Sequence, residues 1–211
     1  MVIKNFVVFE GIDGSGTSTQ IKLLAKNFPQ DKVFVSAEPT SKETGLFLRK
    51  MLRKEFSVSE ITASYLFAAD RAEHIFGKDG VIEQTKLGKV ALSDRYFFSS
   101  LAYQSVSCGK EIPQIVNSPF PLPQVLFFFR IDPKISIERV TNRGETKEIY
   151  EKLDFQQKTA ALYESVIDEY RTLKGSGMTI IDVDASKSIE EISQFILKTI
   201  NNLNIKPINI V

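Results

Sequence analysis

The segment Gly11-Ile12-Asp13-Gly14-Ser15-Gly16-Thr17-Ser18-Thr19 decides the fold class through what stands on either side of it. It follows the β-rich run Phe6-Val7-Val8-Phe9, and a segment of helical period begins at Gln20. Glycines allow left-handed conformations and close approach, so successive backbone N–H groups can converge on phosphate oxygens beside the helix N-terminus. The sequence therefore predicts a phosphate-binding loop at residues 11–18.

This loop matches the spacing G-x-x-x-x-G-K-[ST] except at one position. Thr17 stands where that pattern has a lysine, and Ser18 stands where the Mg²⁺-binding hydroxyl is expected. An alternative needs no ligand, because Ser and Thr are ordinary N-cap residues that could simply begin the helix. The predicted ATP-binding residues are Gly11, Gly14, Ser15, Gly16, Thr17, Ser18 and Thr19.

Four more short apolar runs follow, and none of them alternates: Val33-Phe34-Val35, Val90-Ala91-Leu92, Val125-Leu126-Phe127-Phe128-Phe129 and Met178-Thr179-Ile180-Ile181. Such runs are typical of parallel strands covered on both faces. Amphipathic helical segments separate them, with apolar faces at Ile21, Leu24, Ala25 and Phe28, at Tyr65, Leu66, Ala69 and Ala72, and at Ile189, Ile192, Phe195 and Ile196. The alternation predicts an α/β protein with the P-loop NTPase fold, a five-stranded parallel sheet with helices on both faces.

The composition limits the partners and the number of domains. The 211 residues are 43% hydrophobic and lack a separating linker, which favours one domain spanning residues 1–211. The net charge of +1 provides no global field to recruit nucleic acid or an anionic membrane. Cys108 is the only cysteine, and no cleavage site or long apolar stretch occurs near the N-terminus. We therefore expect a cytoplasmic protein with neither a nucleic acid nor a membrane partner.

Further segments, in the right order, resemble the thymidylate kinase family of P-loop nucleoside monophosphate kinases. The similarity extends from Phe6 to about Tyr163 and includes the opening motif from Phe9 to Gln20. The other matching segments are Glu38-Pro39-Thr40 with Arg49, Leu66-Phe67-Ala68-Ala69-Asp70-Arg71, Ser93-Asp94-Arg95-Tyr96 with Ser99-Ser100-Leu101-Ala102-Tyr103-Gln104, and Arg139-Val140-Thr141-Asn142-Arg143-Gly144-Glu145. The resemblance implies transfer of the γ-phosphoryl group of ATP to dTMP with Mg²⁺, by a protein that is a homodimer in typical members.

The resemblance also assigns the acceptor-binding residues. The carboxylate at the Asp13 position receives the deoxyribose 3′-hydroxyl, and Arg49 lies in the region that holds the 5′-phosphate. Thymine stacks on Phe67 and bonds to Arg71, while Tyr103 packs where a 2′-hydroxyl would go. The predicted dTMP-binding residues are Asp13, Glu38, Pro39, Arg49, Phe67, Arg71, Arg95, Ser100, Tyr103 and Gln104. By itself, the Phe67/Arg71 pair fits a core phenylalanine and a solvated arginine.

The same resemblance places the catalytic groups. Asp94 and Ser18 organise Mg²⁺, and Arg95 spans the phosphates. The predicted catalytic residues are Asp94, Arg95, Arg139 and Arg143. A surface ion pair would equally explain Asp94-Arg95 in isolation.

Residues 142–151 form the candidate lid, a polar segment between two helical patterns. Gly14 supplies no arginine to the phosphate loop, so the lid-arginine subtype of the family fits better, although Lys147-Glu148 departs from the usual Asp-Arg of that subtype. Lid arginines neutralise charge on the transferring phosphoryl group. A charged, solvated helix face would account for these residues equally well.

Two rival functions stay open. One is another P-loop deoxynucleotide or deoxynucleoside kinase, and the other is a nucleotide-binding protein whose phosphotransfer was lost with the lysine at position 17. An active enzyme needs a substitute cation, and the candidates are Arg139, Arg143, Lys147 and Lys22. We assign no role to His74, because a lone histidine is more often structural or exposed than a ligand.

Overall fold

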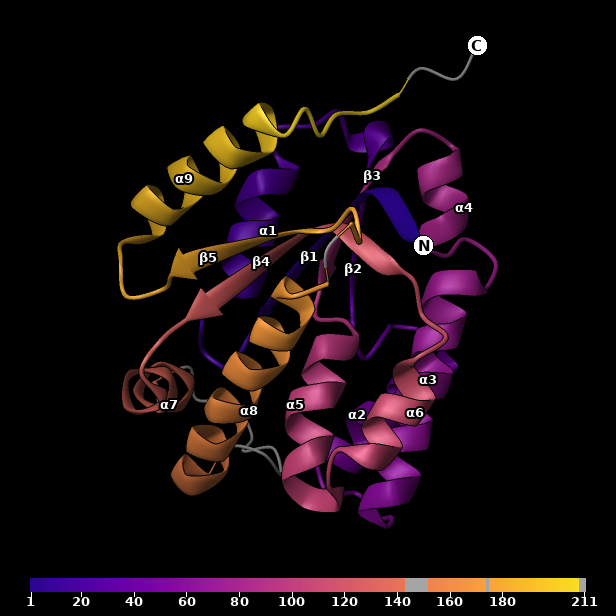
Figure 1. The fold of residues 1–211 in the computed structure, drawn as a ribbon, viewed down its shortest axis with the longest axis vertical. Coiled ribbons are helices and arrows are strands. Elements are labelled where there is room, and N and C mark those ends of the chain that lie inside the picture. The colour runs from indigo at the N-terminus through magenta and orange to yellow at the C-terminus, as the bar shows by residue number, and fades with distance from the viewer. Residues whose placement is uncertain (143–151, 174, 209–211) are drawn as a thin grey trace.

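The computed structural model describes residues 1–142, 152–173 and 175–208, and it contains one five-stranded sheet (Figure 1). The strand order is β2-β3-β1-β4-β5, and every neighbouring pair is parallel. The strands are β1 (Val2–Gly11), β2 (Val33–Ala37), β3 (Val90–Asp94), β4 (Leu122–Arg130) and β5 (Thr179–Asp184). The predicted parallel sheet is confirmed, with each strand at its predicted place in the chain.

The helices alternate with the strands and cover both faces of the sheet (Figure 1). They are α1 (Thr17–Ala25), the 3-10 helix η1 (Gln30–Lys32), α2 (Glu43–Leu52), α3 (Glu60–Phe76), α4 (Val81–Lys86), α5 (Phe97–Cys108), α6 (Glu111–Asn117), α7 (Pro133–Thr141), α8 (Leu153–Arg171) and α9 (Ile189–Asn202). One apolar layer joins the sheet to α1 and α9. A second layer joins the opposite face to α2, α3, α4, α5 and α8. The α/β fold with helices on both faces is therefore confirmed.

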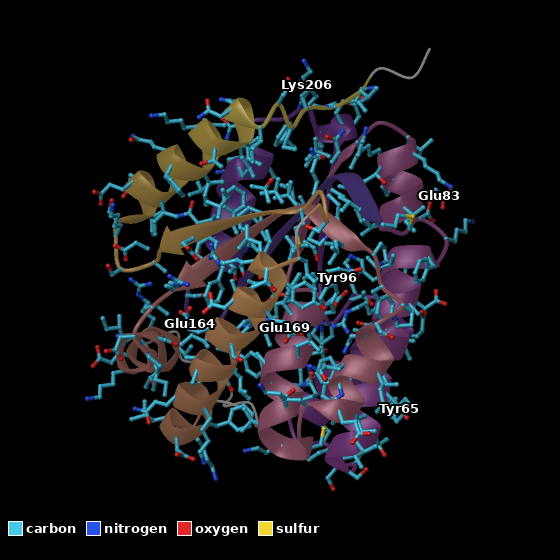
Figure 2. The ribbon with its side chains drawn as sticks, viewed as in Figure 1. Tyr65, Glu83, Tyr96, Glu164, Glu169 and Lys206 are labelled. Atoms are coloured by element: carbon cyan, nitrogen blue, oxygen red, sulfur yellow. The ribbon has the colours of Figure 1, made fainter. Side chains whose placement is uncertain are left out.

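The predicted apolar face of α3 was correct only in part, because Leu66 packs against the core whereas Ala69 is exposed. Tyr65, expected inside, is 53% exposed and lies at the edge of the molecule in Figure 2. The buried face also carries Asp70, Arg71 and His74. These polar groups are buried because they meet partners in the loop after β2, which periodicity of apolar residues cannot reveal.

The prediction for α9 was correct only in part. Ile192 and Ile196 are buried, whereas Ile189 and Phe195 are 52% and 44% exposed. Ile200 continues the buried row, so the inward face follows the spacing of four residues.

The strand ends bring distant segments of the chain together. Phe9 pairs with Asp94, and Ala37 also pairs with Asp94, so the carboxyl ends of β1, β2 and β3 lie side by side. Ligands of open α/β sheets bind in the crevice outside such ends. Among the described residues, no helix is both long and apolar enough to cross a membrane.

Candidate active site

A cleft of about 590 Å³ opens at the carboxyl ends of these three strands. Its volume suits a small molecule, since ligand pockets commonly measure ~300 to 1,000 Å³. Among the residues that line it are Asp13, Ser18, Glu38, Pro39, Arg49, Phe67, Arg71, Asp94, Arg95, Ser100, Tyr103 and Gln104. The fold thus gathers into one cleft every residue predicted to bind the acceptor and both predicted metal ligands.

The phosphate loop has the backbone geometry that the glycine pattern predicts. Gly14 and Gly16 have φ angles of 83° and 97°, in the left-handed region that favours glycine. A Cβ at Gly14 would lie 2.4 Å from the Ser136 carbonyl oxygen, so α7 packs directly on the loop. The hydroxyl of Ser15 is buried without a hydrogen-bond partner among the described residues. A narrow loop with an unpaired buried hydroxyl suits the oxygens of a phosphate.

The start of α1 decides against the reading of this loop as an ordinary helix cap. The N-cap residue is Gly16, and no side chain of the described residues caps the helix by a hydrogen bond. The N–H groups of the first turn therefore remain available to an anion, which the positive end of the helix dipole also favours.

Ser18 and Asp94 form a pair of oxygen ligands at the edge of the loop. The Ser18 hydroxyl donates a hydrogen bond to Asp94 Oδ2, which joins the start of α1 to the end of β3. Hydroxyl and carboxylate oxygens suit Mg²⁺, which keeps several waters and takes one or two protein ligands plus phosphate oxygens. No group of three or more His, Cys, Asp or Glu side chains gathers as a metal site in the described part of the chain. The donor set fits magnesium shared with a nucleotide better than a fully protein-bound ion.

Arg95 lines the cleft and has an unusual backbone conformation, with φ 73°. Its guanidinium donates to the Gly11 carbonyl oxygen at 2.9 Å and forms an ion pair with Asp13 at 2.5 Å. The same group lies 5.2 Å from the centre of the Tyr103 ring. Arg95 therefore pairs with the phosphate loop instead of with its neighbour Asp94, and the reading as a surface ion pair was wrong.

Arg71 is more deeply buried in the wall of the cleft than Arg95. Its side chain is 1% exposed and forms an ion pair with Glu38 at 2.7 Å. It also donates to Ser100 Oγ at 3.0 Å and to Asn117 Oδ1. The alternative of a solvated arginine was therefore wrong, because Arg71 is buried with its guanidinium fixed by three side chains.

A scan against protein-family models matches residues 9–196 to the thymidylate kinase model. The chain belongs to the thymidylate kinase family. It is 41% identical over 198 residues to a protein of Treponema pallidum assigned as a thymidylate kinase, covering 93% of this chain and 94% of the relative. It is 35% identical over 204 residues to one so assigned from Methanocaldococcus jannaschii, covering 96% and 99% of the two chains. The thymidylate kinase of Leptospira interrogans is 34% identical over 194 residues, covering 90% of each chain.

Membership in the thymidylate kinase family confirms the predicted enzyme class. The family consists of nucleoside monophosphate kinases, phosphotransferases that act on the small molecules dTMP and ATP. Phosphorylation of dTMP is the activity of the family, and neither rival function is favoured by these similarities.

Sequence reasoning missed the residues that hold the acceptor half together. His74 was given no role, yet it is 3% exposed and lies 2.8 Å from Glu38 Oε1 through Nδ1 and 2.8 Å from Ser36 Oγ through Nε2. The spacing of three residues from Arg71 on one helix face was the available signal. Asn117, on α6, gave no signal, because only the tertiary structure brings α6 beside α3.

Asp13 also has a partner that the sequence did not suggest. Gln156, on α8, donates to Asp13 Oδ2 at 2.9 Å, and the Asp13 N–H donates to the Tyr103 hydroxyl at 3.1 Å. Burial raises the pKa of Tyr103 well above its usual value, so its hydroxyl stays protonated. The carboxylate of Asp13 is therefore held by Arg95 at one oxygen and by Gln156 at the other, while Tyr103 holds the backbone of the same residue.

Of the two predicted catalytic arginines near the lid, the structure describes only Arg139, and it does not bring this residue together with the rest of the site. Arg139, on α7, donates to the Ala185 carbonyl oxygen at 3.0 Å and does not line the cleft. Arg143 and almost all of the candidate lid, residues 143–151, lie outside the described residues. Their catalytic roles stay predictions.

Proposed function

We propose that this cleft transfers the γ-phosphoryl group of ATP in line to the 5′-phosphate of dTMP, with Mg²⁺, in the pathway to dTTP. The observation that carries the proposal is the meeting of the Ser18/Asp94 oxygen pair with the Arg95/Asp13 ion pair in one cleft. The first pair suits a metal-bound donor, and the second suits a cation aimed at the reacting phosphates. Such a reaction needs positioning and charge neutralisation and no covalent enzyme intermediate.

On the donor side, the backbone N–H groups of residues 11–19 hold the phosphates of ATP. The oxygens of Ser18 and Asp94 would hold Mg²⁺, which neutralises charge on the transferring group when bound. The side chain of Thr17 offers neither the charge nor the reach of lysine, so the backbone carries the binding and a cation from elsewhere must assist. We assign that assistance to Arg95 together with Arg139 or Arg143 of the candidate lid.

On the acceptor side, Asp13 receives the 3′-hydroxyl and Arg95 reaches the 5′-phosphate. Phe67 is half-buried and lines the cleft, so one ring face can stack on thymine. Arg71, Ser100 and Gln104 contact the base, and Tyr103 lies beside the sugar. Glu38, Pro39 and Arg49 lie around the 5′-phosphate. The side-chain oxygen of Gln104 is buried without a partner among the described residues, which suits a hydrogen bond from the base.

We further propose that the chain acts as a single domain of residues 1–211 in a cytoplasmic homodimer. These features follow the resemblance to the family.

The test is a coupled assay of ADP release from ATP with different acceptors. We expect rapid turnover with dTMP, slower turnover with dUMP, and little with dGMP, thymidine or no acceptor. Preference for thymidine or dGMP would indicate another P-loop kinase. Nucleotide binding without turnover on any acceptor would indicate a protein that has lost its phosphotransfer activity.

A further inference from the structure

Glu10 is a buried carboxylate beneath the cleft that none of the roles above uses. It is the second-last residue of β1 and is 0% exposed. A buried carboxylate is costly unless hydrogen bonds or a cation compensate for its lost hydration. The hydrogen-bond partners of Glu10 therefore show how its burial is compensated and which groups it positions.

One oxygen of Glu10 caps the helix that carries much of the acceptor site. Oε1 accepts hydrogen bonds from the Tyr96 N–H at 2.7 Å and the Ser99 N–H at 3.2 Å, at the start of α5. Tyr96, which lies among the interior side chains in Figure 2, is the N-cap residue and makes no side-chain cap of its own. Glu10, which lies on β1, thus acts as the N-cap acceptor that Tyr96 does not supply. The positive end of the helix dipole also stabilises a carboxylate at this place.

The other oxygen holds two hydroxyl groups. Oε2 accepts from Ser99 Oγ at 2.6 Å and from the Tyr163 hydroxyl of α8 at 2.8 Å. The two hydroxyls also lie 2.7 Å from each other. When each donates its single proton to Glu10, the lone pairs of both can accept from a further donor.

Those lone pairs face Arg95. Its Nη1 donates to Ser99 Oγ at 3.1 Å and lies 3.3 Å from the Tyr163 hydroxyl. The hydrogen bonds therefore run in one direction, from the guanidinium through the hydroxyls to the carboxylate. The backbone of Arg95 is fixed as well, because its N–H donates to the Phe9 carbonyl oxygen at 2.9 Å beside Glu10.

We propose that Glu10 is a positioning residue for phosphoryl transfer, whose ionised carboxylate orients Ser99 and Tyr163 as acceptors for Arg95 and fixes α5 beneath the acceptor. The proposal rests on the proposed function, since Arg95 is the group that meets the reacting phosphates there. A neutral amide cannot replace the carboxylate: whichever way it turns, its NH₂ faces either the two N–H donors or the two hydroxyls that must donate.

The ionisation of Glu10 supports this geometry. Burial raises its pKa from 4.5 to about 7, while the Arg95 charge and the hydrogen bonds from Ser99, Tyr163 and Tyr96 act against the rise. Among the described residues, the charged or titratable groups beyond Arg95 that act on this cluster are Asp13, Asp94, Tyr103 and Tyr163. Protonation below pH ~7 would reverse one hydrogen bond of the relay and loosen Arg95.

The test compares Glu10→Gln with Glu164→Gln, which makes the same change at an exposed carboxylate on α8 that pairs with Arg130. Wild-type turnover with dTMP is measured first, and its absence would contradict the proposed function without bearing on Glu10. Given wild-type activity, we expect Glu10→Gln to lower kcat about 10- to 100-fold, as the loss of an orienting partner usually does. The affinity for dTMP, measured by calorimetry without ATP, should change far less than kcat.

The pH profile separates positioning from a merely structural effect. The kcat of the wild type and of Glu164→Gln should rise with pH through about 7. Glu10→Gln should lose that rise. An unchanged profile, or a loss shared equally by kcat and dTMP affinity, would overturn the proposal.

Tyr163→Phe tests the relay without altering the carboxylate, in case Glu10→Gln folds poorly. We expect a smaller fall in kcat, and the double variant should lose less than the product of the two single losses because both act through Arg95. Wild-type kcat in Tyr163→Phe, or fully multiplicative losses, would contradict the relay.

Discussion

The two halves of the cleft are built in different ways. On the acceptor side, Arg71 is 1% exposed and Glu38 is 6% exposed, and both are held by side chains from several elements. On the donor side, the phosphate loop offers backbone N–H groups and glycines, and Ser18 is exposed. A flat base with a defined hydrogen-bonding edge is recognised by side chains fixed in advance, whereas phosphates are recognised by any array of N–H groups of the right curvature.

This difference shows where the chain can vary. We infer that the donor side tolerates Thr17 in place of lysine, because binding there would depend on the backbone and the missing charge could come from another segment. The acceptor side has no such freedom, because removing one member of a buried charge network leaves the others unpaired.

The largest expected effect tests whether the donor side takes its cation from the candidate lid. Arg143→Ala should lower kcat by about 10³-fold or more, since a transition-state arginine is worth that much in phosphoryl transfer. Affinity for dTMP should hardly change, as measured by calorimetry. Arg171→Ala, which removes an exposed arginine paired with Asp182, is the control. Normal turnover in Arg143→Ala would remove the lid arginine from the mechanism.

The next effect concerns Glu10, which lies where the two halves meet. Its pKa is raised from 4.5 to about 7, so the folded state binds this proton more tightly than the unfolded state. The resulting stabilisation is complete below pH 4.5 and is lost as pH rises through about 7. Relative to wild type, Glu10→Gln should therefore gain stability between those values, by roughly 3 kcal/mol for a shift of this size. Urea unfolding at several pH values measures it, and a constant difference would mean an ordinary pKa.

Phe67→Ala should affect the acceptor and leave the donor untouched. Base–aromatic stacking contributes about 1 to 3 kcal/mol, so dTMP should bind correspondingly more weakly while ATP affinity is kept. Tyr65→Ala, on the exposed face of the same helix, is the control. Equal losses of affinity for dTMP and ATP would indicate that Phe67 only packs in the core and does not stack on thymine.

An acceptor with a ribose in place of deoxyribose tests whether Tyr103 excludes a 2′-hydroxyl from the sugar pocket. Tyr103 is 5% exposed and fixed by Asp13, so a 2′-hydroxyl beside it would be buried without a partner. That burial costs about 1 to 3 kcal/mol, and kcat/KM for the ribonucleotide of thymine should fall accordingly below that for dTMP. Equal kcat/KM values for the two acceptors would remove this role from Tyr103.

The smallest effect is expected from restoring the lysine. Thr17→Lys should leave kcat near the wild-type value or raise it modestly, because the lid cations already replace the charge. A gain of about 10²-fold would show that nothing had replaced it, since one such charge contact is worth that factor. Lys22 also lines the cleft, so Lys22→Met compares the other candidate cation. A large loss there would transfer the role from the lid to α1.

The order of local motifs could be predicted because each motif depends on neighbours in the chain. The apolar runs gave the five parallel strands, and the glycine spacing gave the left-handed turns at Gly14 and Gly16. The resemblance to the family also predicted which residues line the cleft, because each of its motifs contributes a few of them between Asp13 and Gln104. The polar part of the inward face of α3 could not be found this way, because only the partners of Asp70, Arg71 and His74 explain why these residues are buried.

By itself, the sequence determined the strand–loop–helix unit at residues 6–25, the parallel sheet and the family, since these follow from local periodicity, glycine placement and motif order. Only the tertiary structure decided the pairings of the polar groups: Arg71 with Glu38 and Asn117, Arg95 with Asp13, and Glu10 with Ser99 and Tyr163. A buried polar side chain needs a partner at a hydrogen-bond distance, and which residue supplies it depends on how helices far apart in the chain pack on the sheet.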